Sequence, residues 1–191
     1  MKKLMATAAA SLVLSSSLFA AALDEGSIKI NFEGYKTPAM IGTKGAFSKA
    51  QFKFNKDTSS LSKQLTNASV TLSPKDVDMG GTENQVITDN IVNAFFGTLN
   101  NKGDIKVVIN NVIEGESKGT ISAKVTIGNQ STLVPLTYAV TGNNDFEAKG
   151  QLDLTAFSNA TKALKALSDA APGHQNVSWN VVSLTINGKI K

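Results

Sequence analysis

Apolar and polar residues alternate along most of the chain, and a two-residue period is typical of strands with one buried face and one solvent-facing side. In the clearest example, 121–127, the odd-numbered positions are Ile, Ala, Val and Ile, and the positions between them are Ser, Lys and Thr. The pattern recurs over eight segments, at 28–33, 50–54, 68–72, 105–110, 121–127, 134–140, 146–154 and 182–186. The sequence therefore predicts an all-β domain of eight antiparallel strands.

Two segments depart from this period and predict short helices. Between 84 and 96, apolar residues recur every four positions, and Thr82 with Gln85 has the spacing of a capping box before them. Between 156 and 168, apolar residues again share one helical face, with Thr155 as the expected N-cap.

The amphipathic strands must bury their apolar faces together. Eight such strands can close a barrel whose interior fits side chains or one small ligand. A two-sheet sandwich is the alternative that the pattern leaves open. An outer-membrane barrel is disfavoured, because such barrels carry aromatic girdles, and only Trp179, Tyr35 and Tyr138 could supply interfacial Trp and Tyr side chains here.

The first residues have the features of a secretory signal peptide. Lys2 and Lys3 are followed by a mostly apolar run at 4–19 and then by Ala20-Ala21-Ala22, whose small side chains suit a cleavage site. The run is short for a membrane span, although a retained N-terminal anchor is the alternative. We expect cleavage after the third alanine, a mature domain at 23–191 with no membrane span, and a periplasmic location.

Composition excludes several classes of function. The 191 residues include no Cys, which excludes a disulfide scaffold, an iron–sulfur site and a thiol nucleophile. The only His is His174, which disfavours a His-based metal site and a Ser-His-Asp enzyme. All 19 basic residues are Lys, which disfavours nucleic-acid binding, because Arg supplies the bidentate contacts to phosphate and guanine. We therefore expect no catalytic residue and no cofactor.

One stretch partly matches a calcium-binding loop. The run 76–81 has Asp at its first and third positions, but Gly80 stands at its fifth position, and Ile87 stands where the bidentate Glu should be. We expect an acidic turn there, and no metal site.

Short motifs follow one another along 26–191. They are 28–32 (IKINF), 45–47 (GAF), 52–54 (FKF), 125–128 (VTIG), 133–136 (LVPL), 150–154 (GQLDL) and 179–186 (WNVVSLTI). In this order and spacing they resemble the YceI-like family of periplasmic, lipocalin-like proteins, and Phe95-Phe96 match an aromatic pair of that family. The family often has an Arg-Asp pair in the same helix, whereas 83–96 has Asp89 and no Arg, so a role of that Arg does not carry over.

The resemblance implies an extended antiparallel, lipocalin-like β-barrel with a lipid-sized interior, and often a homodimer. On this basis we expect a binding protein that holds a long apolar lipid (a polyisoprenoid, quinone or fatty-acyl amide) as carrier or buffer. One alternative is a structural or interaction protein whose barrel is packed solid. An enzyme of isoprenoid or quinone metabolism is the least favoured alternative.

The expected ligand-binding residues are inward apolar side chains and the aromatic pair of the first helix. They are Ile30, Phe32, Phe52, Phe54, Phe95, Phe96, Val107, Ile109, Ile121, Val125, Leu136, Tyr138, Phe146 and Leu152. The alternative is that these side chains fill one another's space. Tyr138 adds a hydroxyl that could meet a ligand head group or be satisfied within the barrel, and Phe95 with Phe96 could cover one barrel mouth or simply pack the helix.

Overall fold

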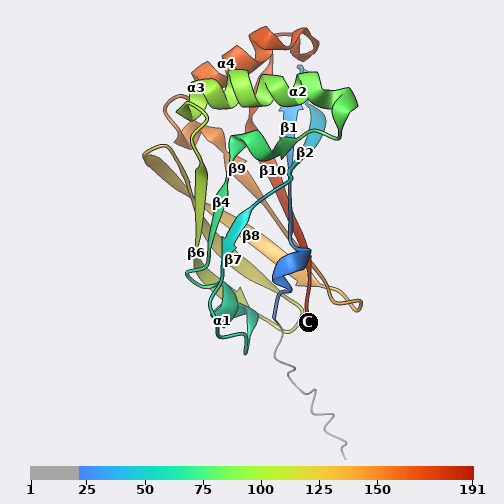
Figure 1. Ribbon diagram of the computed structural model, residues 1–191, viewed down its shortest axis with the longest axis vertical. Helices are drawn as coiled ribbons and strands as arrows, with labels where there is room; N and C mark the ends of the chain where they lie inside the picture. The colour runs from blue at the N-terminus through green and yellow to red at the C-terminus, as the bar shows by residue number, and fades with distance from the viewer. Residues whose placement is uncertain (1–21) are drawn as a thin grey trace, which may run out of the picture.

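The computed structural model describes residues 22–191 as one antiparallel sheet of ten strands, curled into a half-barrel (Figure 1). The strand order is β3-β4-β6-β7-β8-β9-β10-β1-β2-β5. The strands are β1 (Lys29–Lys36), β2 (Ile41–Phe47), β3 (Gln51–Lys53), β4 (Ser69–Leu72), β5 (Val77–Asp78), β6 (Ile105–Glu114), β7 (Lys118–Ile127), β8 (Gln130–Val140), β9 (Asp145–Asp153) and β10 (Ser178–Lys189). The expected signal peptide lies outside the described residues, except for Ala22.

The antiparallel, all-β prediction is confirmed, but the count of eight strands is wrong. The two unpredicted strands are β2, in which Gly42 and Gly45 interrupt the apolar alternation, and β5, which has only two residues. No ladder joins the edge strands β3 and β5 within the described part of the chain, so hydrogen bonds do not close the barrel. A sandwich is excluded, because all ten strands belong to one sheet.

The long strands direct apolar side chains to the inner face. On β7, Ile121, Ala123, Val125 and Ile127 are all buried, whereas Lys124 is exposed. Val125 pairs with Val107 on β6 and Thr132 on β8. This alternation follows from the strand pleat, which directs successive side chains to opposite faces of a sheet.

Helices cover one end of the half-barrel (Figure 1). The first predicted helix is continuous through α2 (Gln85–Asn90), a π-helical turn (Ile91–Phe95) and α3 (Phe96–Asn100), and the second is α4 (Ala160–Ala170). No helix within residues 22–191 combines the length and apolarity needed to cross a membrane.

Both predicted N-caps are wrong, although the first helix begins at Gln85, close to its predicted start. Thr82 lies in a preceding 3₁₀ turn (Thr82–Asn84), and no side chain caps α2. The Thr155 backbone amide and hydroxyl donate to the Asp153 carboxylate at 2.9 and 2.7 Å. This contact stabilises a separate 3₁₀ turn (Leu154–Ala156), and α4 begins five residues after Thr155.

The opposite end of the half-barrel is closed by α1 (Leu61–Leu65) and by the first described residues. The Gln64 side chain, which is 1% exposed, accepts from the Leu23 amide at 2.7 Å and donates to the Leu23 carbonyl at 2.9 Å. Leu23 also forms a bridge with Ile190 near the C-terminus. Gln64 therefore satisfies both backbone polar groups of a buried residue, as burial of polar groups requires.

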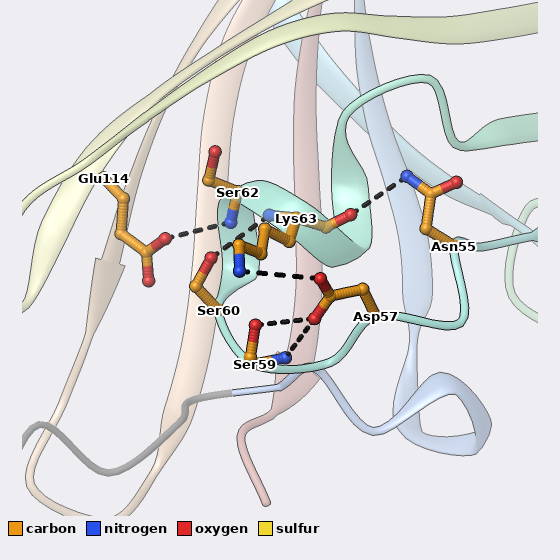
Figure 2. A network of polar contacts seen from close by, with 7 residues as sticks. All are labelled: Asn55, Asp57, Ser59, Ser60, Ser62, Lys63 and Glu114. Carbon is orange, nitrogen blue, oxygen red and sulfur yellow. Dashed lines mark hydrogen bonds and ion pairs between the residues drawn. The ribbon is translucent and has the colours of Figure 1, made fainter.

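Polar contacts hold α1 in place, as Figure 2 shows. The Ser60 hydroxyl caps the helix by accepting from the Lys63 amide at 3.2 Å. The Glu114 carboxylate, at the end of β6, accepts from the Ser62 amide at 2.9 Å. A carboxylate at a helix N-terminus is favourable, so Glu114 ties this helix to the sheet.

The face assignment on β7 predicts opposite effects for two adjacent substitutions. Val125→Lys places an unpaired ammonium among buried side chains, which destabilises the fold by at least about 2 kcal/mol. Because each kcal/mol lowers the thermal midpoint of a domain of this size by about 2–4 °C, we expect the midpoint to fall by at least about 4–8 °C. Lys124→Glu should change stability by at most about 0.5 kcal/mol. Equal thermal midpoints for the two variants, measured by circular dichroism, would contradict the assignment.

Candidate ligand-binding cavity

The inner face of the sheet and the covering helices enclose a cavity of about 510 Å³. This volume lies within the range of small-molecule sites, roughly 300–1,000 Å³. Thirteen of the fourteen expected residues line it, namely Ile30, Phe32, Phe52, Phe54, Phe95, Phe96, Val107, Ile109, Ile121, Val125, Leu136, Phe146 and Leu152. Strands far apart in the sequence therefore bring these side chains to one apolar surface.

Many of these inward side chains are not fully buried. Ile30 and Phe32 on β1 and Val107 and Ile109 on β6 are only partly buried, although they pack against the buried core. In a solid core these side chains would contact one another on all sides and exclude solvent. Their residual exposure shows that the interior is open, which argues against the alternative of a solid barrel.

Tyr138 is the exception among the expected residues, because it does not line the cavity. It is 3% exposed and stacks on Phe146 with a centroid separation of 5.4 Å. It packs so closely on β7 that a Cβ at Gly119 would lie 2.6 Å from the tyrosine ring. Burial, together with the charge of Glu114, raises the pKa of Tyr138, and its hydroxyl has no hydrogen-bond partner within residues 22–191. Tyr138 therefore belongs to the α1 end of the barrel.

Other lining residues were not among the expected site residues. They are apolar side chains from β2, the β5–α2 connection, the first helix, α4 and β10, such as Phe47, Met79, Ile91, Leu164, Leu184 and Ile186. The two-residue period had already marked 182–186 as a strand, and the helical period had marked Ile91 and Leu164. Phe47 lies on the unpredicted strand β2, so periodicity did not identify it.

A small group of polar side chains lines the helix-covered end of the cavity. Lys36, at the end of β1, pairs in register with Ser178, at the start of β10, and both line the cavity with His174. The Ser178 hydroxyl lies 2.7 Å from His174 Nδ1 and 2.7 Å from the Ser168 hydroxyl. Three elements, β1, β10 and the 3₁₀ turn after α4 (Pro172–His174), thus bring a cation, an imidazole and a hydroxyl to one mouth.

The electrostatic environment keeps this imidazole neutral at pH 7. Burial lowers the pKa of His174, and the nearby charge of Lys36 lowers that pKa further. The His174 ring contacts the Ser178 hydroxyl through Nδ1, and within residues 22–191 no carboxylate is hydrogen-bonded to the ring. The pair therefore lacks the third group that orients the base in serine hydrolases.

The partial calcium-loop motif forms an acidic turn. The Asp78 carboxylate accepts from the Gly80 and Gly81 amides at 2.9 and 3.0 Å. These two contacts lower the pKa of Asp78. Over residues 22–191, no group of three His, Asp or Glu side chains has an arrangement that could hold a metal ion.

Comparisons with known proteins identify the fold. No protein-family profile matches the sequence, and no curated protein matches it significantly. Among solved structures, a polyisoprenoid-binding domain from Saccharophagus degradans implicated in plant cell wall breakdown aligns with a TM-score of 0.62 and 13% identity, over 91% of this chain and 98% of that one. BcnA from Burkholderia cenocepacia aligns with a TM-score of 0.58 and 17% identity, over 88% and 99% of the two chains.

A third solved structure carries the family name that the sequence motifs suggested. The YCEI protein of Campylobacter jejuni aligns with a TM-score of 0.54 and 17% identity, over 78% of this chain and 85% of that one. The chain therefore shares the fold of YceI-type proteins, as its motifs predicted.

The environment of His174 predicts a pH dependence of stability. Its pKa is lower in the folded protein than the value of about 6.5 expected for the unfolded chain. The unfolded state therefore binds the proton more readily, and the stabilisation present above pH 6.5 is lost as the pH falls below that value. We expect the free energy of unfolding in urea to decrease more between pH 7.5 and 5.5 for the wild type than for His174→Gln. Identical decreases, or an imidazole pKa above 6.5 by NMR, would contradict this.

Proposed function

We propose that this protein is a YceI-like binding protein that holds a long apolar lipid, such as a polyisoprenoid, a quinone or a fatty-acyl amide, in its cavity as carrier or buffer. The observation that carries the proposal is the open cavity of about 510 Å³, lined by apolar side chains from strands and helices. An interior of this kind favours an apolar occupant, because water inside it has few hydrogen-bond partners.

The energetics of burial support a long chain as the occupant. Each buried methylene contributes roughly 0.8 kcal/mol, so about ten methylenes contribute roughly 8 kcal/mol, which corresponds to micromolar affinity. Ordering a flexible chain makes the binding free energy less favourable. A longer chain offsets this loss, because it buries more methylenes. The name of one structural relative, a polyisoprenoid-binding domain, supports the same ligand class.

The same features support binding without catalysis. The cavity wall is mostly apolar, and within residues 22–191 the His174 imidazole is hydrogen-bonded to the Ser178 hydroxyl and to no carboxylate. The proposal therefore assigns no reaction to this site. It also includes a signal peptide at 1–22, a mature domain at 23–191, a periplasmic location and a homodimer, of which the last rests on the family resemblance.

Narrowing the cavity should reduce its lipid content. Val107 lines the cavity, whereas its neighbour Val108 is 38% exposed on the outer face of β6. We expect wild-type protein and Val108→Trp to carry a copurified lipid in native mass spectrometry. Val107→Trp should carry less than about half as much, because the indole occupies volume that the chain requires. Protein without lipid in the wild type, after extraction from its own host, would contradict the proposal.

The proposed location predicts a defined N-terminus. Removal of the segment that ends in Ala20-Ala21-Ala22 should leave Leu23 as the first residue. N-terminal sequencing of the protein from a periplasmic fraction tests this directly. A sequence that starts at Met1, or recovery of the protein in the cytoplasmic fraction alone, would contradict it.

A further inference from the structure

A lysine ends the row of inward positions on β1. Ile30, Phe32, Gly34 and Lys36 follow the two-residue period, and all four line the cavity. The row therefore ends in a lysine that lines the cavity beside Ser178 and His174. Lys36 is partly buried as a residue.

No acidic side chain neutralises this ammonium within residues 22–191. The ion pairs found there involve Lys63, Lys149, Lys165, Lys189 and Lys191. Glu33, which precedes Lys36 on β1, directs its carboxylate to Gly42 on β2, and neither Glu33 nor Gly42 lines the cavity. A cation without an acidic partner favours the approach of an anion.

Further hydrogen-bond groups lie beside Lys36. Ser178 is its register partner on β10, and the Ser178 hydroxyl contacts His174 Nδ1 at 2.7 Å. In the tautomer whose Nδ1 accepts from the Ser178 hydroxyl, the neutral imidazole carries its hydrogen on Nε2, and Nε2 makes no hydrogen bond within residues 22–191. The mouth therefore combines one ammonium with an imidazole that can donate a hydrogen bond.

On this geometry we propose that the cavity mouth recognises an anionic head group, a carboxylate or a phosphate, that is attached to the apolar chain of the ligand. Lys36 supplies the charge, and His174, positioned by Ser178, supplies a hydrogen bond. The inference rests on the proposed lipid-binding function and specifies its ligand class. Charge-assisted contacts of this kind are stronger than neutral ones.

The test compares two probes with the same chain. cis-Parinaric acid carries a carboxylate, its methyl ester carries no charge, and both fluoresce in apolar sites. We expect the wild type to bind the acid about tenfold more tightly than the ester. Lys36→Met should reduce this ratio to about twofold or less. Lys44→Met, an exposed position on β2 that does not line the cavity, should retain the wild-type ratio, and binding of the ester verifies that each variant is folded.

The possible results separate the two proposals. Equal affinities for acid and ester in the wild type overturn the head-group proposal and leave lipid binding intact. Failure of both probes to bind overturns the proposed function and the head-group proposal together. Titration with inorganic phosphate, monitored by NMR at the His174 ring resonances, shows whether the site binds a free anion rather than a lipid head group. If phosphate binding requires Lys36 but the acid-to-ester ratio does not, the mouth is a free-anion site and the proposal is overturned.

Discussion

The strand pleat imposes the constraint on which the rest of this structure depends. Alternate side chains point to opposite faces, so a long curled sheet collects all its apolar side chains on the concave side. The sheet here is one curved layer of ten strands, and Val107 and Leu184, from opposite parts of it, face a common space. Helices cover this space at one end, but the side chains do not fill it. The result is an apolar cavity on the concave side of the sheet.

The two ends of this cavity differ in their polar groups, so a ligand with one polar end has a preferred orientation in it. At the α1 end, Gln64 satisfies both backbone groups of Leu23, and Glu114 holds the start of α1. At the helix-covered end, His174 and Lys36 line the cavity. A chain with one polar end can thus place its apolar part inside and its polar end at the mouth.

Periodicity predicted the faces of the long strands and the two helical segments, because burial on one side leaves a regular sequence pattern. It missed β2, where Gly45 is required by close packing: a Cβ there would lie 2.5 Å from Met79 Sδ and 2.6 Å from the Phe32 ring. Periodicity assigns a face but not the distance across a barrel, so it could not distinguish a cavity from a solid core. For the same reason it could not place Tyr138 at the closed end. Lys36 was missed because a glycine and a charged residue do not continue an apolar pattern, so the predicted strand ended at residue 33 although β1 continues to Lys36.

The central claim is that an apolar chain occupies the interior, and paramagnetic NMR tests it most directly. Stearate with a nitroxide near its methyl end broadens methyl resonances that lie close to it. The account predicts selective broadening of inward methyl groups such as those of Ile109 and Ile121, while those of Ile113 and Leu133, which are 64% and 58% exposed, remain sharp. Broadening confined to the exposed methyl groups would place the chain on the outer surface and contradict the account.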